Sequence, residues 1–385
     1  MGEFACAVNR GLATSGIAPS AKHFPGHGDT HVDSHLGLPR ILKDLDELRQ
    51  VELVPFKSLI AADVATVMTG HIALPKITGS DTPGSLSREI TTDLLREDLG
   101  FKGVIVTDDL EMNAVAQLYG VEHGALMALG AGADIIMVCH TPASQKGAVE
   151  LVLEAVSKGK LTTSSLRQSQ LRIAHLKSQF TGSWSDVLDP VFDSGKIAQL
   201  RSEHAALSAR AYQASTALVS DPTGILPISG GEAVVLFTPG NVSLNPVVDS
   251  ANKAPLSDTS FASFIGARTQ HIHHVVYTKD FTVTDELGHR LSAAEYIVFA
   301  TRNADRSVWQ LEALSTIAEV KGPSTEVIMV STCAPYDLLD IKPDFPFAYL
   351  ATFEFTTPAY EAVTKVIFGE AKPTGTVPVL DGNVL

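Results

Sequence analysis

Histidine and aspartate are concentrated in one short stretch of the sequence, residues 22–35, where both could carry acid–base chemistry. Four of the chain's 13 histidines fall within this stretch, with two aspartates among them. Asp33 and His35 are two positions apart, so on an extended loop their side chains project to the same side. A carboxylate beside an imidazole fixes the tautomer of the ring and raises its pKa, which yields a proton donor near neutral pH. This pair is therefore a candidate general acid and base.

A second acidic pair, Asp108 and Asp109, follows directly after the apolar run 103–107. A carboxylate at the end of such a strand is placed to attack a cationic centre or to stabilise it. Cleavage of a glycosidic bond requires a proton donor and a carboxylate on either side of an oxocarbenium-like transition state. The usual pair is two carboxylates, and here His35 would replace one of them.

The histidine-rich stretch allows two other interpretations. Histidine and aspartate at short spacings can ligate zinc or iron, but Pro25, Gly26 and Gly28 make this segment a loop without helical spacing. A solvated polar loop is the ordinary explanation for an isolated Asp-X-His. The acidic pair after the apolar strand favours acid–base chemistry over both, so we expect neither a metal nor a cofactor.

Strands and helices alternate along the first half of the sequence. Short extended or apolar runs predict strands, and apolar positions at helical spacing predict helices. The predicted strands are 19–23, 64–69, 103–107 and 134–138, and the predicted helices are 44–62, 87–99, 109–129 and 142–158. This alternation predicts a parallel sheet covered by helices. Polar residues follow the strand ends, among them Lys22, His23 and Asp108, and in α/β barrels the chemistry gathers at those ends.

The second half of the sequence predicts another, independent sheet. A stretch with Ser, Gly, Asp and Pro at about 178–200 is typical of a linker, and a helix is predicted to follow it. The predicted strands beyond it are 233–237, 273–277, 296–300, 327–330 and 348–352, with helices such as 308–320 and 358–368 between them. This pattern indicates an open α/β sheet with helices on its faces.

Length, composition and charge limit the class of protein. At 385 residues, with 45% hydrophobic and 19% charged residues, the chain suits a globular enzyme of two domains. A net charge of −14 argues against nucleic acid as a partner. No apolar run is long enough to span a membrane. Three scattered cysteines and no visible secretory signal favour a reducing, cytoplasmic location.

Several stretches resemble family 3 glycoside hydrolases, in the branch of β-N-acetylglucosaminidases. Residues 22–39 are similar to the long signature loop of that branch, and residues 94–112 resemble its nucleophile strand with the helix before it. Residues 215–227 and 368–379 resemble the start and the end of the family's C-terminal domain. The resemblance implies an α/β fold in which the C-terminal part of a (β/α)8 barrel precedes an α/β sandwich. The expected domains are a partial barrel at 1–180, a linker at 181–200 and a sandwich at 201–385.

The resemblance also implies a role for each candidate residue. Asp108 matches the nucleophile, His35 matches the acid/base, and Asp33 matches the aspartate paired with that histidine. Lys22 and His23 match the pair that binds the sugar hydroxyls. The implied reaction is the retaining hydrolysis of terminal β-linked N-acetylglucosamine, so the expected partner is a small carbohydrate.

The sequence departs from the family before the Lys-His loop, and other functions remain open. Members carry about four strand–helix units before the Lys-His loop, whereas this chain has only about 20 residues there, so we expect barrel units five to eight alone. Exposed sheet edges would then favour self-association. The alternatives are a phosphorylase, because a neutral histidine does not repel phosphate, an inactive fragment that binds sugars or partners, and a metal-dependent hydrolase.

Overall fold

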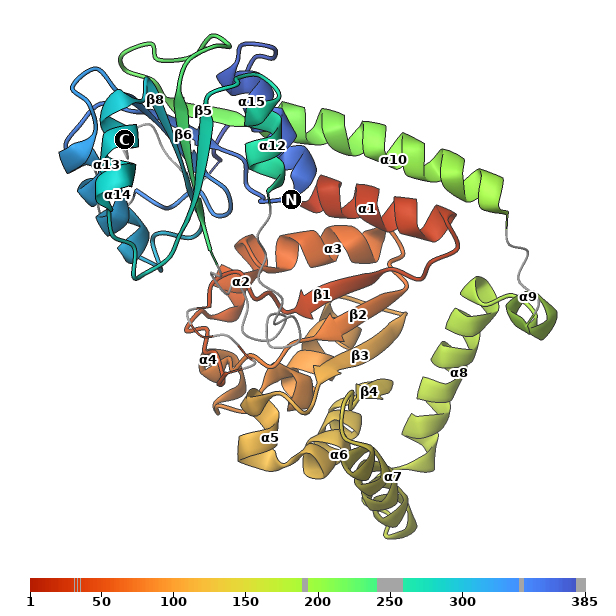
Figure 1. Cartoon of the computed structure of the whole chain (residues 1–385). Coiled ribbons are helices and arrows are strands. Elements are labelled where there is room, and N and C mark those ends of the chain that lie inside the picture. The colour runs from red at the N-terminus through yellow and green to blue at the C-terminus, as the bar shows by residue number, and fades with distance from the viewer. Residues whose placement is uncertain are drawn as a thin grey trace. The chain divides into compact units, whose positions relative to one another are not determined.

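The computed structural model describes residues 1–30, 32, 34, 36–188, 193–240, 259–338 and 343–378. The chain divides into two compact units, residues 1–192 and 193–385, and each is described by itself (Figure 1). The predicted acid/base pair, Asp33 and His35, lies outside the described residues. None of the described helices is long and apolar enough to cross a membrane.

The first unit is built on a parallel sheet whose strands lie side by side in chain order. These strands are β1 (Ser20–Phe24), β2 (Thr66–Thr69), β3 (Val104–Asp109) and β4 (Ile135–Met137). Phe24 pairs with Thr69, Thr69 with Thr107, and Asp109 with Met137. All four strands therefore end at one edge of the sheet. The predicted α/β class with a parallel sheet is confirmed, and the described residues of this unit form an open sheet.

The helices of the first unit precede, connect or follow its strands. They are α1 (Gly2–Thr14), α2 (Leu45–Gln50), α3 (Leu53–Ala61), α4 (Pro75–Thr78), η1 (Gly84–Leu86), η2 (Glu89–Asp98), α5 (Asn113–Tyr119), α6 (Val121–Ala131), α7 (Pro142–Ser157), α8 (Thr163–Phe180) and α9 (Trp184–Leu188). The prediction of single helices at 44–62 and 109–129 was wrong, since each range contains two. At Gly120, which separates α5 from α6, φ is 74° and ψ is 148°, and glycine adopts this conformation without the steric penalty of a side chain.

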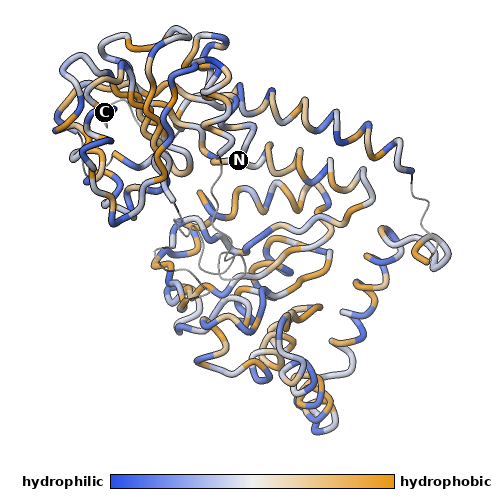
Figure 2. Tube along the Cα trace, in the orientation of Figure 1, coloured by the Kyte–Doolittle hydropathy of each residue, from blue (hydrophilic) through white to orange (hydrophobic). Residues whose placement is uncertain are grey.

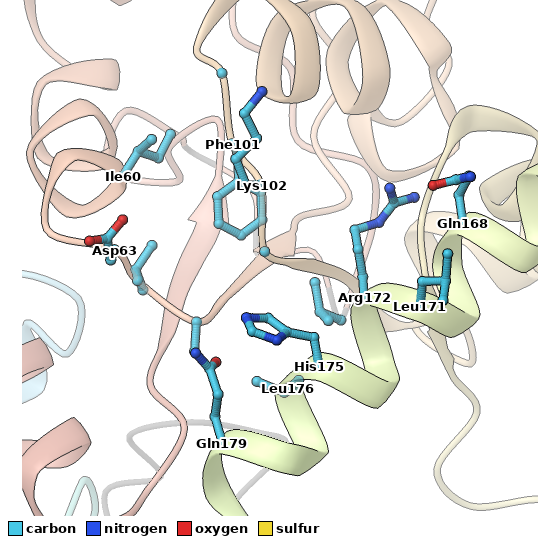
Figure 3. A pocket seen from close by; sticks show the side chains of 15 residues that line it. Ile60, Asp63, Phe101, Lys102, Gln168, Leu171, Arg172, His175, Leu176 and Gln179 are labelled. Atoms are coloured by element: carbon cyan, nitrogen blue, oxygen red, sulfur yellow. The ribbon is translucent and has the colours of Figure 1, made fainter.

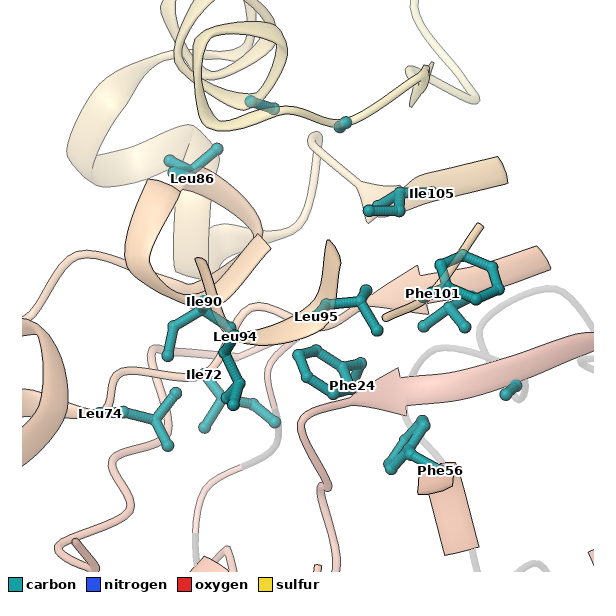
Figure 4. Packing of buried hydrophobic residues seen from close by; sticks show 14 of the residues in the cluster. Phe24, Phe56, Ile72, Leu74, Leu86, Ile90, Leu94, Leu95, Phe101 and Ile105 are labelled. Carbon is teal, nitrogen blue, oxygen red and sulfur yellow. The ribbon is translucent and has the colours of Figure 1, made fainter. Parts of the chain in front are cut away.

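Phe24, the last residue of β1, fixes that strand to the core of the unit. Its ring is fully buried and packs edge-to-face on Phe56 of α3, with ring centroids 5.1 Å apart. Figure 4 shows both rings beside Ile72, Leu94 and further buried side chains of the loop after β2 and of η2. Burying one such ring contributes about 1.5–3 kcal/mol, so the carboxyl end of β1 is held firmly where Lys22 and His23 emerge.

The second unit contains a six-stranded mixed sheet in the order β5-β10-β9-β8-β6-β7. Its strands are β5 (Ala217–Ser220), β6 (Val234–Pro239), β7 (Ile272–Tyr277), β8 (Tyr296–Thr301), β9 (Glu326–Ser331) and β10 (Ala348–Ala351). Only β5 is antiparallel to its neighbour. The second predicted sheet is thus present, and β6, β8, β9 and β10 are almost wholly buried, as strands covered on both faces should be. Figure 2 colours the chain by the hydropathy of each residue.

The described helices of the second unit are α10 (Ser194–Ser215), α12 (Ser260–Gly266), α13 (Asp285–Ala293), α14 (Trp309–Val320) and α15 (Thr357–Ile367). Four of them, α12 to α15, pack on this sheet, whereas the first, α10, packs on α15 and has no buried residue. The long helix α10 begins inside the range expected as a linker, capped by the Asp193 side chain, which accepts a hydrogen bond from the Lys196 amide.

Candidate active site at the carboxyl edge of the first sheet

Asp108 and His23 meet at the carboxyl edge of the first sheet, although β2 lies between their strands. Nε2 of His23 is 3.4 Å from Oδ2 of Asp108. The other carboxylate oxygen of Asp108 accepts a hydrogen bond of 2.9 Å from the amide of Asp109. The side chain of Asp108 is 17% exposed, and that of His23 is 29% exposed. The carboxylate is therefore oriented from two sides and still accessible to a small molecule.

His23 is an imidazole whose neutral form is favoured. Burial lowers its pKa below the ordinary value of 6.5, the carboxylate of Asp108 raises it in part, and the charge of the neighbouring Lys22 lowers it again. A neutral ring at pH 7 has one N–H donor and one acceptor. Lys22 is exposed on the same strand end, and its charge acts on the His23 ring.

His71, just beyond β2, supports the strand that carries Asp108. The imidazole is fully buried, and its Nε2 donates to the carbonyl oxygen of Asp109 at 2.9 Å. Its Nδ1 lies 2.7 Å from the hydroxyl of Ser85, which fits a hydroxyl donor and a neutral ring. His71 was not predicted from the sequence as a site residue, although its position two residues after a strand end was an available signal.

The carboxylate of Asp109 does not face His23 as Asp108 does, and it joins β3 to the segment after β4. Its Oδ1 accepts hydrogen bonds from the amides of Glu111 and Cys139, both at 3.2 Å. Its Oδ2 is 3.3 Å from Nε2 of His140. Burial and the Asp109 carboxylate raise the pKa of the Cys139 thiol, which keeps that thiol protonated. Asp109 thus braces the sheet edge, whereas Asp108 faces the open side.

The loop after β1 leads from His23 toward the predicted acid/base pair. Within it, Nδ1 of His27 lies 2.7 Å from the Thr30 hydroxyl and Nε2 lies 3.2 Å from the Ser34 hydroxyl. The ring of His27 also packs edge-on to that of His23, with centroids 6.0 Å apart. His27 is therefore held as part of the loop. In the part of the chain that the structure describes, no group of His, Cys, Asp and Glu side chains is arranged to hold a metal ion.

A separate hollow lies at the opposite end of the strands. Its volume is about 560 Å³, and it is bounded by the segments before β2 and β3 and by α8. Figure 3 shows side chains of α8, among them Arg172 and His175, beside the segment that carries Phe101 and Lys102. Since Asp108 lies at the other end of β3, this hollow is distinct from the candidate active site.

Known proteins of one family are similar to this chain. Residues 1–176 match the family described as glycosyl hydrolase family 3 N terminal domain. Beta-hexosaminidase A of Pseudoalteromonas piscicida is 28% identical over 416 residues, which is 96% of this chain and 67% of that protein. A beta-hexosaminidase of Neisseria gonorrhoeae is 42% identical over 139 residues, or 36% of this chain and 38% of that protein.

Two solved structures of similar fold extend this likeness over both units. A fungal multi-domain GH3 beta-N-acetylglucosaminidase is 34% identical, with a TM-score of 0.84, over 99% of this chain and 43% of that one. A glycoside hydrolase family 3 beta-N-acetylglucosaminidase from Paenibacillus sp. is 29% identical, with a TM-score of 0.83, over 99% of this chain and 70% of that one. The chain spans less than half of the Neisseria and fungal proteins. By these matches and by its fold, the chain is similar to enzymes of glycoside hydrolase family 3, and residues 1–176 match the N-terminal domain of that family.

Proposed function

We propose that the edge of the first sheet hydrolyses terminal β-linked N-acetylglucosaminides with retention of configuration. The observation that supports this proposal is how the two carboxylate oxygens of Asp108 are held. One of its oxygens is held by the Asp109 amide at 2.9 Å, and the other lies 3.4 Å from Nε2 of His23, at an accessible strand end. A carboxylate held in this way is a suitable nucleophile for a sugar carbon that develops positive charge.

The proposed reaction has two steps. In the first, Asp108 bonds to the anomeric carbon while the bond to the leaving oxygen breaks, and that oxygen takes a proton from His35. In the second, His35 removes a proton from water, and the water oxygen displaces Asp108 from the sugar. Asp33 keeps the His35 ring in the required tautomer.

Lys22 and His23 are proposed to bind the hydroxyl groups of the sugar. The ammonium group of Lys22 offers donors only, and the neutral ring of His23 offers one donor and one acceptor. The names of the relatives, beta-hexosaminidase and beta-N-acetylglucosaminidase, support an N-acetylhexosamine at this position. His23 touches Asp108, so a sugar bound by His23 has its anomeric carbon near the nucleophile.

The test is an assay of the 385-residue chain on an aryl β-N-acetylglucosaminide, with Asp108→Asn beside it. Release of the phenol that disappears in the variant supports the proposal. The assay is run with and without phosphate, because a neutral His35 would also admit an anion as the acceptor. A requirement for phosphate, with a sugar phosphate as product, would replace hydrolysis by phosphorolysis. No release by the unaltered chain would count against the activity for this chain.

A further inference from the structure

The loop after β1 is seated on Glu52, the residue that precedes α3. Gly26 has a φ of +136°, and a Cβ atom at this position would lie 2.8 Å from Cβ of Glu52. Only glycine adopts this φ readily and also leaves room for the Glu52 side chain. The contact places the start of the loop directly against the side chain of a nearly buried carboxylate, since the Glu52 side chain is only 5% exposed.

Lys43 joins this carboxylate to the loop. Its Nζ is 2.6 Å from Oε1 of Glu52 and 2.8 Å from Oδ2 of Asp29. Hydrogen bonds to the two carboxylates raise the pKa of Lys43 well above its usual range, so the amine stays charged throughout the working range of an enzyme. A buried carboxylate without a counter-charge is strongly unfavourable, and Lys43 supplies that charge to Glu52. The same ammonium group thereby holds Asp29 of the loop.

A second set of contacts carries this restraint further along the loop. The His27 ring is bonded to Thr30, next to Asp29, and to Ser34. Ser34 is 4% exposed and stands between Asp33 and His35 in the sequence. The loop is therefore connected internally from residue 27 to residue 34, and Lys43 connects it to the rest of the unit at Asp29.

We propose that Lys43 is a positioning residue that sets the location of the acid/base loop without touching the substrate. This inference rests on the proposed function, because it takes His35 as the proton donor. A general acid must lie within hydrogen-bond reach of the leaving oxygen. A displacement of about 1 Å can lower a rate on the order of 10²-fold. Loss of Lys43 should therefore weaken proton donation more than sugar binding.

The experiment compares Lys43→Met and Asp29→Asn with Lys76→Met as the control. Lys76 is an exposed lysine whose Nζ lies 4.0 Å from Oε2 of Glu47, so Lys76→Met removes an exposed ion pair. For each protein, kcat/KM is measured on 4-nitrophenyl and on methyl β-N-acetylglucosaminide. Nitrophenolate leaves with little help from an acid, whereas methoxide must be protonated, so the ratio of the two values reports proton donation. Lys43→Arg keeps the charge and should restore most of the loss.

We expect Lys43→Met to lower kcat/KM for the methyl glycoside roughly 10- to 100-fold and for the nitrophenyl glycoside less than about 5-fold. Asp29→Asn should act in the same direction and more weakly. Equal losses on both substrates would overturn the proposal, because a smaller fraction of folded protein lowers both alike. A loss of the same kind in Lys76→Met would overturn it as well.

Hydrogen exchange of the backbone amides in residues 26–38 separates this inference from the proposed function. We expect faster exchange there in Lys43→Met and in Asp29→Asn, with no change in Lys76→Met. Unchanged exchange in both loop variants would overturn the anchoring role, whatever the activity. If the unaltered chain cleaves neither glycoside while exchange in this segment still depends on Lys43, the proposed activity fails and the anchoring role stands.

Discussion

Two aspartates of the first unit, at opposite ends of its parallel strands, differ in how fully their carboxylates are bonded. Asp134, just before β4, has a side chain with no exposed surface. Its oxygens accept from Arg96 at 2.8 Å, the Ile105 amide at 2.9 Å, the Ser169 hydroxyl at 2.7 Å and Arg172 at 2.9 Å. Asp108, at the end of β3, keeps 17% of its side chain exposed and has one backbone donor and one imidazole beside it.

This difference separates a carboxylate that can react from one that cannot. Each carboxylate oxygen of Asp134 accepts from two donor residues, so this residue joins η2, β3 and α8 at the amino end of the sheet. Attack by Asp134 on a substrate would break several charge-assisted bonds. Asp108 is held firmly enough to be oriented and leaves one oxygen near the open edge. In α/β barrels the residues at the amino face generally contribute to stability and those at the carboxyl face to chemistry, and the role proposed for Asp108 agrees with that rule.

The largest expected effect is on catalysis and comes from Asp108→Asn. An amide cannot form the glycosyl ester, so we expect turnover of an aryl glycoside to fall on the order of 10⁴-fold or more. The free energy of unfolding should change by less than about 1 kcal/mol, because the side chain is partly solvated and the Asp109 amide keeps an acceptor. Activity assays and urea denaturation of the same preparation measure both quantities. Turnover close to that of the unaltered chain would remove Asp108 from the mechanism.

Asp134→Asn should reverse that pattern. Removing this charge leaves Arg96 and Arg172 facing each other without a common counter-ion, and breaking a buried ion pair costs about 3–5 kcal/mol. We expect a lower midpoint of urea denaturation, with kcat of the protein that remains folded nearly unchanged. Asp93→Asn, which removes an exposed pair with Arg88 at 3.5 Å, is the matched control and should cost about 0–1 kcal/mol. If Asp134→Asn loses no more stability than Asp93→Asn, the contacts of Asp134 with Arg96 and Arg172 do not stabilise the fold.

A third substitution tests whether Ser85, at the carboxyl edge, stabilises the fold through its contact with His71. In Ser85→Ala, Nδ1 of the buried His71 loses its hydroxyl donor, and we expect about 1–3 kcal/mol of lost stability. Ser80→Ala removes an exposed hydroxyl contact with Thr82 and should change stability by less than about 0.5 kcal/mol. Thermal denaturation of the two variants provides the comparison. Equal midpoints would mean that the Ser85 hydroxyl does not stabilise His71.

The carboxyl edge was easier to predict from the sequence than the amino edge, for a physical reason. Asp108 follows an apolar run, and this local pattern indicated both the strand and a carboxylate at its end. Asp134 draws its partners from Arg96, Ser169 and Arg172, which lie 35 to 38 residues away in the chain. No local pattern indicates such pairs, since they depend on how η2 and α8 pack on the sheet. The same holds for His71, which is bonded to Ser85 in η1 and to the backbone of β3.

The smallest effect concerns His23 and its titration. Its pKa lies below 6.5 because burial outweighs the attraction of Asp108. Asp108→Asn removes the group that raises this pKa, so an NMR titration of the His23 ring should show a further decrease in the variant. The unfolded chain binds the proton at a higher pH than the folded chain does. This group therefore costs stability as the pH falls from about 6.5 toward the folded pKa, and the cost becomes constant below it. An increase of the His23 pKa in Asp108→Asn would contradict the contact between the two side chains and, with it, the contrast between an oriented Asp108 and a saturated Asp134.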